Sequence, residues 1–349
     1  MPPLAENNLR NQFKLQFRFL LLAIAAYALL TPALVEAGQA KKSTTSRSKT
    51  TATKRVTAAR ARAVATAREM ADTAVPRYKV DASGELVPDV HAAAAIIYNP
   101  DTNEVLFEEN SLDQRSIASI TKVMTATVFL ESNPDLSQMV TVARSDVYRA
   151  STTYLRAADK LSVDDLLHLL LIPSDNAAAR VLARVSPYGS EGFIRRMNEK
   201  AAELGLQSTH YADPSGLLSD NVSSAYDMAR LIALASSDER ISNTMKLSEY
   251  TVHAARRDIA IRSTNHLLGR DDIDVMGAKT GFISKSGYCL ATLLRLQDGG
   301  QQVAFVILGA RSNAGRFMET QNLITWLASK AQTIFATKTP TLTATPEEH

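Results

Sequence analysis

The chain has 349 residues, 45% of them hydrophobic and 21% charged, an ordinary globular balance with room for one large domain and extensions or for two domains. Its single cysteine, Cys289, excludes an internal disulfide and argues against a cysteine-based metal site. The net charge of +3 hides an asymmetry, because residues 39–80 hold eleven Lys and Arg against two acids, whereas residues 81–349 carry a net −7. The overall charge therefore gives little information about a binding site in the folded part.

The first 37 residues have the pattern of an export signal. Three basic residues precede an apolar run from residue 19 to residue 30, and Val35 and Ala37 suit the −3 and −1 positions of a cleavage site. The run is shorter than the roughly 20 apolar residues that span a bilayer, although counting on to residue 35 brings it closer. We therefore expect an exported protein of the periplasm or cell envelope, with the signal either removed or retained as a membrane tether.

Residues 38–80 are rich in Ala, Thr, Ser, Lys and Arg and contain no aromatic residue before Tyr78. Such a segment cannot bury enough apolar surface to offset the entropy lost on ordering, so we expect a disordered basic tether. In composition alone it resembles tails that bind nucleic acid. The export signal argues against a nucleic-acid partner, and we expect peripheral contact with anionic wall polymers or lipid headgroups instead.

Residues 81–335 are expected to form the folded domain, followed by a frayed tail at 336–349. Strand patterns lie at both ends of this domain, in 92–98, 104–107, 277–283, 288–296 and 302–309. Helical patterns begin near Ser119 and recur in 163–172, 177–185, 192–204, 225–235 and 315–335. This order predicts an α/β (α+β) fold, in which an antiparallel sheet built from both ends is flanked by helices and an all-helical subdomain is inserted between its strands.

Ser119 and Lys122 lie at the start of the first of these helices. Apolar side chains recur every three or four residues from Ile117 to Val128, which predicts a helix packed on several sides, with Ser116 as its N-cap. The hydroxyl of Ser119 and the amine of Lys122 then share one face. Burial favours a neutral amine, which can take the serine proton and leave a nucleophile able to attack a carbonyl. The alternative is a capping serine and a snorkelling lysine on an ordinary core helix.

Two further short patterns accompany this S-x-x-K pair. Ser174-Asp175-Asn176 follows Pro173 at the break between two predicted helices, where side chains can point into a cleft, and Lys279-Thr280-Gly281 lies on a predicted strand. Each pattern also has other copies in the chain, namely Ser46–Lys49, Ser219–Asn221, Ser263–Asn265 and Lys285–Gly287. The copies lie in the tether, in polar loops or in a tight turn, so order, spacing and context set the first three patterns apart.

The three patterns in this order resemble the serine penicillin-recognising enzymes, which include β-lactamases and penicillin-binding proteins. Within that group, the chain resembles the low-molecular-mass D-alanyl-D-alanine peptidases of family S11. The segments that carry the resemblance are I-A-S-I-T-K-V-M-T-A (117–126), L-I-P-S-D-N-A-A-A-R (171–180), Y-A-D-P-S-G-L (211–217) and G-A-K-T-G-F (277–282). R-S-T-N (262–265) and the short chain after the last helix are similar to the DD-endopeptidase branch. The implied fold is that of β-lactamases and DD-transpeptidases.

The resemblance implies an acyl-enzyme mechanism that needs neither a metal nor a cofactor. Ser119 would be the nucleophile and Lys122 its base. Ser174 and Lys279 would pass a proton and keep the site positive, and Asn176 would orient Lys122 and the substrate amide.

Substrate binding is implied for the strand that carries the third pattern. Thr280, Gly281 and Phe282 would lie along the extended peptide, which pairs with this strand as an added β-strand does. The backbone N–H groups of Ser119 and Phe282 would form the oxyanion hole. Thr280 and Arg316 would hold the substrate carboxylate, although Arg316 is equally consistent with an ordinary surface arginine.

The function implied is that of a serine-type D-alanyl-D-alanine carboxypeptidase or DD-endopeptidase. It would act on peptidoglycan stem peptides or cross-links and be inhibited covalently by β-lactams. One alternative is a serine β-lactamase, but no E-x-x-x-N that could supply a deacylating glutamate lies between Asn176 and Ser215. The other alternative is a catalytically weak wall-binding homologue, against which the intact motifs argue. The sequence does not separate carboxypeptidase from endopeptidase activity.

Overall fold

The computed structural model describes residues 64, 67, 75–296 and 300–337. The predicted signal at 1–37 lies outside these residues, as do most of the predicted tether and of the predicted tail. Within the part of the chain that is described, no helix is both long and apolar enough to cross a membrane.

The core of the domain is a five-stranded antiparallel sheet with the strand order β11-β12-β13-β3-β4. Its central pairing joins the two ends of the domain, since Ile96 on β3 lies opposite Val306 on β13. This confirms the predicted sheet built from both ends. The strands are β3 (Ala94–Asn99), β4 (Glu104–Glu109), β11 (Asp274–Ile283), β12 (Gly287–Arg295) and β13 (Gln302–Ala310).

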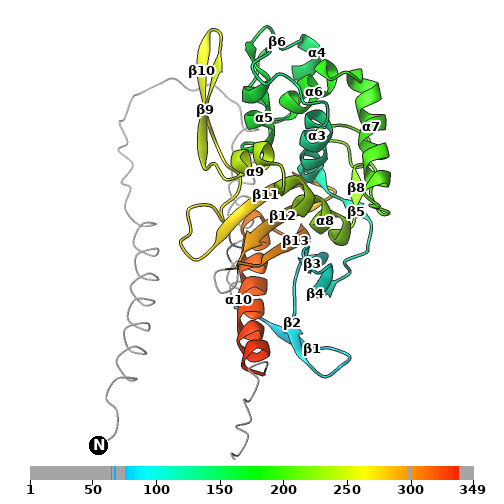
Figure 1. Cartoon of the computed structure of the whole chain (residues 1–349), viewed down its shortest axis with the longest axis vertical. Helices are drawn as coiled ribbons and strands as arrows, with labels where there is room; N and C mark the ends of the chain where they lie inside the picture. Colours follow the sequence, from blue (N-terminus) through cyan, green and yellow to red (C-terminus); the bar gives the residue numbers. More distant parts are fainter. Residues whose placement is uncertain (1–63, 65–66, 68–74, 297–299, 338–349) are drawn as a thin grey trace, which may run out of the picture. The chain divides into compact units, whose positions relative to one another are not determined.

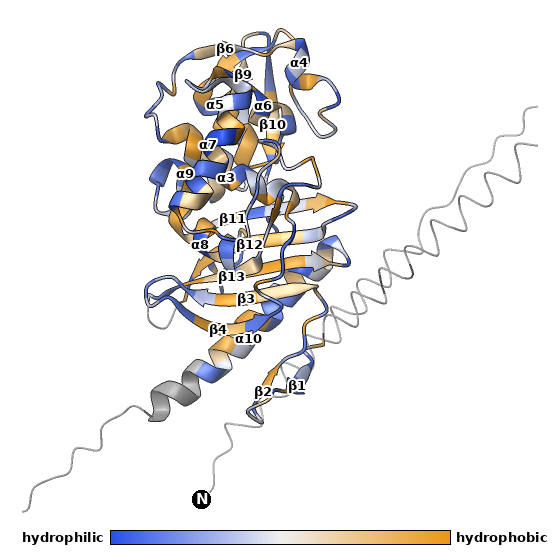
Figure 2. Cartoon of the chain, turned by 90° about the vertical axis from the view of Figure 1, so that its right-hand side faces the viewer, coloured by the Kyte–Doolittle hydropathy of each residue, from blue (hydrophilic) through white to orange (hydrophobic). Residues whose placement is uncertain are grey.

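Alternate side chains of the central strands enter two separate hydrophobic cores, as the period of two in a strand requires. Ile96 packs in the core that also contains residues of α8 (Ala225–Ser236), whereas Ile97 packs with α10 (Asn313–Thr337) through residues such as Trp326. The two helices therefore cover opposite faces of the sheet (Figure 1). Because both faces are covered, strands β13 and β3 are hydrophobic along most of their length (Figure 2).

A helical subdomain is inserted between β4 and β11, as predicted. At its centre is α3, nine of whose ten residues are buried, so this helix is covered on several sides as its apolar spacing predicted. The helices of this subdomain are α3 (Thr121–Leu130), α4 (Arg144–Val147), α5 (Val163–Leu171), α6 (Asn176–Val185) and α7 (Gly189–Glu203).

The predicted N-cap at Ser116 is wrong. Ser116 lies in the short strand β5 (Arg115–Ser116), which pairs with β8 (Val222–Ser223), and α3 begins only at Thr121. Between them, residues 118–120 form a 3₁₀ turn without a side-chain cap. Pairing of β5 with β8 holds the backbone before the helix in an extended conformation, so tertiary contacts override the local capping signal.

Several short elements were not predicted. They include the strand pairs β1 (Tyr78–Val80) with β2 (Leu86–Pro88), β6 (Met139–Thr141) with β7 (Lys160–Ser162) and β9 (Glu249–Ala254) with β10 (Arg257–Arg262), and the helix α9 (Glu239–Met245). Each is short or has one exposed face, so its hydrophobic pattern is weak.

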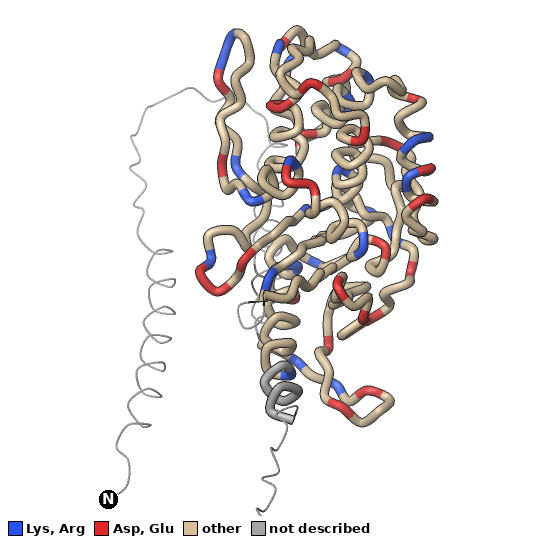
Figure 3. Tube along the Cα trace, in the orientation of Figure 1, with Lys and Arg blue, Asp and Glu red and all other residues tan. Residues whose placement is uncertain are grey.

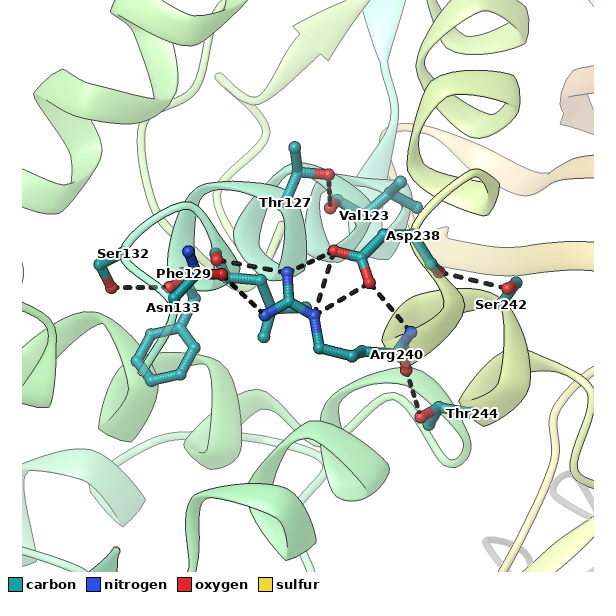
Figure 4. A network of polar contacts seen from close by, with 10 residues as sticks. Val123, Thr127, Phe129, Ser132, Asn133, Asp238, Arg240, Ser242 and Thr244 are labelled. Carbon is teal, nitrogen blue, oxygen red and sulfur yellow. Dashed lines mark hydrogen bonds and ion pairs between the residues drawn. The ribbon is translucent and has the colours of Figure 1, made fainter. Parts of the chain in front are cut away.

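The end of α3 is fixed by charged side chains of two neighbouring helices. Arg240, in the first turn of α9, binds the carboxylate of Asp238 and donates to the carbonyl of Leu130 and the side chain of Asn133 (Figure 4). On the other side, the carboxylate of Glu131 forms ion pairs with basic side chains of α7. Acidic and basic residues alternate along that helix (Figure 3). The contact from Arg240 satisfies the carbonyl group of Leu130 and places positive charge at the negative end of the helix dipole.

The start of α5 shows how a side chain can stabilise the end of a helix, and Ser162 is the residue that does so. Its hydroxyl accepts from the backbone N–H of Asp165 and bonds the Asp165 carboxylate, both at 3.0 Å, so Ser162 is the N-cap of α5. We expect Ser162→Ala to lower the free energy of unfolding by about 1 kcal/mol, measured by chemical denaturation. Ser190→Ala, at an exposed site in the first turn of α7, is the matched control and should change it by a few tenths at most. Equal losses in both variants would contradict the capping role.

Candidate active site

Ser119 and Lys122 are brought together at the start of α3. Ser119 lies in the 3₁₀ turn and Lys122 in the first turn of the helix, and the Lys122 Nζ lies 2.9 Å from the Ser119 Oγ. The serine side chain is half-buried and lines a cleft, whereas the lysine is fully buried beneath it. The snorkelling alternative is therefore wrong, because the amine does not reach solvent.

The amine of Lys122 has two further partners, both of them oxygen acceptors. It donates to the Oδ1 of Asn176 at 2.7 Å and to the carbonyl of Ser215 at 2.5 Å. Burial lowers the pKa of Lys122 to about 7, with a smaller contribution from the charge of Arg180, while the carboxylates of Asp175 and Asp213 oppose this shift. A substantial fraction of the amine is therefore neutral near pH 7.

A neutral amine fits these three partners. It has two N–H bonds, which can be donated to the Asn176 and Ser215 oxygens, and one lone pair, which then faces the Ser119 hydroxyl. In this arrangement the serine O–H donates to the lysine nitrogen, which is the geometry that proton removal requires.

The second predicted motif lies at the break between α5 and α6. Ser174 has a left-handed backbone (φ +68°), and its hydroxyl oxygen is buried without a hydrogen-bond partner in the described structure. Asn176 donates its side-chain N–H to the carbonyl of Ala150 at 2.8 Å, which turns its oxygen toward Lys122. The residue between them, Asp175, is buried and caps α6 through the backbone N–H of Ala178. Its role is structural.

The third predicted motif lies on β11 beside Ser119. Lys279 is fully buried and donates to the carbonyl of Thr280 at 3.1 Å. Burial, together with the charges of Lys122 and Arg316, holds the pKa of Lys279 well below its usual value. The Thr280 hydroxyl lies 2.5 Å from that of Thr264, a residue in one of the additional motif copies, which sequence reasoning had set aside.

Two glycines allow the backbone to pack tightly against the Ser119 turn. A Cβ on Gly216, whose φ is +77°, would lie 2.0 Å from the carbonyl oxygen of Ala118. A Cβ on Gly281 would lie 2.7 Å from the Ile117 carbonyl oxygen and 3.1 Å from the Ser119 backbone nitrogen. Ala118 itself has a left-handed backbone (φ +47°), so the turn that presents Ser119 is strained and is held by its neighbours.

The loop that presents the Ser215 carbonyl is organised by one carboxylate. Asp213 accepts from the backbone N–H groups of Ser215, Gly216 and Leu218 and from the side chain of Asn221. Burial raises the pKa of Asp213, but these hydrogen bonds outweigh burial and hold it below its usual value. The Ser219–Asn221 copy of the second motif is therefore part of the loop scaffold.

Arg316 is buried, so its interpretation as an ordinary surface arginine is wrong. Its guanidinium donates to the carbonyls of Gly281 and Cys289, both at 3.0 Å, and its Nε has no hydrogen-bond partner among the described residues. Burial lowers the pKa of Arg316 to about 10. Arg316 supports the strand that carries the third motif and also lines the cleft.

These residues meet at a cleft of about 670 Å³ between β11 and the helical subdomain. Lys122 and Lys279 lie beneath it, and the other predicted site residues line it: Ser119, Ser174, Asn176, Thr280, Gly281, Phe282 and Arg316. The cleft is also lined by Ser151, Thr152, Leu217 and Thr264, to which the sequence assigned no role. Ser151 and Thr152 lie in a loop without a recognisable pattern. Leu217 and Gly216 were noticed only within the segment 211–217, and Thr264 only within a motif copy.

The close contact at Gly216 makes a testable prediction. We expect Gly216→Ala to reduce acylation of Ser119 by a β-lactam at least ~10²-fold, because the added methyl group displaces the serine turn. Gly269→Ala is the matched control, since Gly269 has the same φ of +77° but open space around it. In both variants an alanine is forced into a left-handed backbone conformation, which costs roughly 1–2 kcal/mol. The difference between their acylation rates therefore measures the effect of the contact with Ala118 alone. Equal acylation rates would contradict it.

Comparison with known proteins agrees with this geometry. Residues 81–312 match the family model of D-alanyl-D-alanine carboxypeptidase, peptidase S11. The D-alanyl-D-alanine endopeptidase of Escherichia coli is 32% identical over 244 residues, which cover 69% of this chain and 78% of the relative. The D-alanyl-D-alanine endopeptidase of Haemophilus influenzae is 33% identical over 233 residues, which cover 66% of this chain and 80% of the relative. The carboxypeptidase DacD of Escherichia coli is 31% identical over 254 residues, covering 68% and 63%.

The fold is also similar to that of solved structures. The Streptomyces K15 DD-transpeptidase superposes with a TM-score of 0.63 at 27% identity, covering 68% of this chain and 97% of that one. The predicted DD-transpeptidase-like fold class is thereby confirmed. With 232 consecutive residues matched by the family model and endopeptidase relatives above 30% identity, the chain belongs to the D-alanyl-D-alanine carboxypeptidase family, peptidase S11.

Proposed function

We propose that this protein is a serine DD-peptidase that cleaves D-alanyl-D-alanine bonds in peptidoglycan stem peptides or cross-links through an acyl-enzyme on Ser119. The observation that carries the proposal is the fully buried amine of Lys122, which lies 2.9 Å from the Ser119 hydroxyl and has a pKa lowered to about 7. A nucleophile with an adjacent neutral base is the requirement for acyl transfer at neutral pH.

Acylation begins when the Ser119 oxygen attacks the carbonyl carbon of the scissile bond and its proton passes to Lys122. The carbonyl oxygen becomes an oxyanion, which the backbone N–H groups of Ser119 and Phe282 stabilise. The C–N bond then breaks, and the leaving amine receives a proton that Ser174 relays from Lys122. The unpartnered Ser174 hydroxyl is available for this relay. Water later attacks the ester carbonyl and releases Ser119.

The lining of the cleft favours a peptidase over a β-lactamase. None of the residues that line the described cleft is an aspartate or a glutamate, so no carboxylate is placed to activate water on a penicilloyl ester. The intact Ser119–Lys122 pair likewise supports an active enzyme over a wall-binding homologue that has lost turnover.

Cleavage of cross-links is the activity that we favour within this proposal. The endopeptidase relatives at 32–33% identity support it. In addition, Arg316 already donates to two backbone carbonyls, which leaves fewer of its N–H groups for a terminal carboxylate. An extended peptide on β11, with Thr280 beside its carboxyl end, is compatible with both a stem peptide and a cross-link as the substrate.

The N-terminal segments support a location in the cell envelope as part of this proposal. Residues 1–37 act as the export signal, which holds the chain at the membrane if it is not removed, and the basic residues of 38–80 rest on anionic wall polymers or lipid headgroups. The charge and low aromatic content of residues 38–80 support this part of the proposal.

Ser119 should form a long-lived covalent adduct with penicillin. The reactive serine lines the cleft and the cleft lacks a carboxylate for deacylation, so the adduct should accumulate with one label per chain. Labelling with a fluorescent penicillin, followed by peptide mapping by mass spectrometry, tests this. A label on another residue, or an unlabelled folded protein, would exclude Ser119 as the nucleophile.

The acylation rate should depend on the protonation of Lys122. The neutral amine is the base, so the rate should level off above pH 7 and fall about tenfold for each pH unit below it. Lys122→Arg keeps the positive charge but cannot lose its proton, so acylation should drop at least ~10²-fold at every pH. Circular dichroism checks that this variant stays folded. A wild-type profile that is flat between pH 5 and pH 8 would exclude Lys122 as the base without any variant.

A further inference from the structure

A second cavity adjoins the active-site cleft at the end of β11. It has a volume of about 270 Å³, and its lining includes Arg115, Ser116, Ser219, Lys285 and Ser286. We call it the basic pocket. Two of its lining residues are cationic and none is acidic.

In each of three separate segments, some residues line the cleft and residues close to them in sequence line the basic pocket. The two cavities are therefore neighbours. Along β11 and its turn, residues 282–284 line the cleft and residues 285–286 line the pocket. In the loop after Asp213, residues 216–217 line the cleft and Ser219 lines the pocket. Before α3, Ser119 lines the cleft and Ser116 the pocket. The pocket is thus an extension of the cleft beyond Ser119.

Three polar side chains of the basic pocket, those of Arg115, Ser116 and Lys285, are available for a ligand. The side chain of Ser116 is more than nine-tenths buried, and its hydroxyl has no hydrogen-bond partner in the described structure. Neither Arg115 nor Lys285 forms an ion pair with any described residue. The nearest acids in sequence, Asp113 and Asp220, are exposed and do not line the pocket. Two cations and a hydroxyl around one cavity are suited to a carboxylate.

The direction of the bound peptide decides which carboxylate reaches this pocket. In the proposed mechanism, Thr280 lies at the carboxyl end of the substrate, and the scissile carbonyl lies between Ser119 and Phe282. The part of the peptide before the scissile bond therefore runs past residues 283–284 toward Lys285. β11 ends at Ile283 and Lys285 lies in the turn that follows, so the distance from Phe282 to Lys285 is at most the roughly 10 Å of an extended three-residue segment, which two or three substrate residues can span.

We propose that the basic pocket is a specificity subsite, which binds a free carboxylate on the peptide two or three residues before the scissile bond. This inference rests on the proposed function and adds to it a preference for acidic stem peptides. Lys285 and Arg115 supply the charge, and Ser116 donates its hydroxyl proton to a carboxylate oxygen.

Two synthetic peptides test the inference. Both end in D-alanyl-D-alanine, and they differ only in whether the second and third residues before the scissile bond carry free carboxylates or the corresponding amides. We expect wild-type protein to cleave the carboxylate peptide with a kcat/KM roughly three- to tenfold higher, the range for a charge-assisted hydrogen bond at a partly exposed site. This preference should shrink as salt is raised.

Lys285→Ala and Ser116→Ala should each bring the ratio of the two kcat/KM values closer to one. Lys285→Glu should reverse the preference, so that the amide peptide is cleaved better. Lys246→Ala removes an exposed lysine at the end of α9 that lines neither cavity, and it should keep the wild-type preference. Equal cleavage of both peptides by wild-type protein, or a preference that survives in Lys285→Ala and Ser116→Ala, would overturn the subsite. If wild-type protein cleaves neither peptide and penicillin does not label Ser119, the proposed function itself fails.

Discussion

The amine of Lys122 is buried with three polar partners, and much of the fold serves to hold those partners in place. Ser119 comes from the turn before the same helix, Asn176 from the start of α6, and the Ser215 carbonyl from the loop after Asp213. A buried amine without such partners would cost several kcal/mol, and a charged one considerably more. The site therefore exists only when the helical subdomain and its loops are assembled together.

The Ser119 turn depends in the same way on the sheet. Gly281 brings the backbone of β11 against Ile117 and Ser119, and Gly216 brings the opposite loop against Ala118. Arg316, from α10 on the far face of the sheet, holds the carbonyl of Gly281. The proposed catalytic residues are thus held between two layers, and a change in either layer moves Ser119 relative to the strand that would bind substrate.

The sequence was sufficient to identify the three motifs, because each depends on local spacing. It was also sufficient to predict the sheet built from both ends and the helical insertion, because these depend on strong hydrophobic periodicity. It failed where tertiary contacts override local preference. Ser116 looks like a cap but lies in a strand, since pairing with β8 holds the chain extended there. The contacts of Thr264 and of the Ser215 carbonyl could not be predicted, because the motif copy that contains Thr264 lies in a polar loop whose position in the fold the sequence does not give, and a backbone oxygen carries no residue identity. The burial of Arg316 likewise depends on the packing of α10 against β12.

The order of strands in the sheet has a consequence for how the chain folds. β13 is the last strand to be synthesised, yet it lies between β12 and β3, and it joins residue 306 to residue 96. Until β13 is available, β3 lacks its central partner, and the two cores on either side of the sheet remain incomplete. Contacts so distant in sequence form slowly, because the long intervening chain must be closed first. Ser119 and Lys122, the proposed nucleophile and base, therefore lie early in the chain but can become a reactive pair only after β13 has joined the sheet.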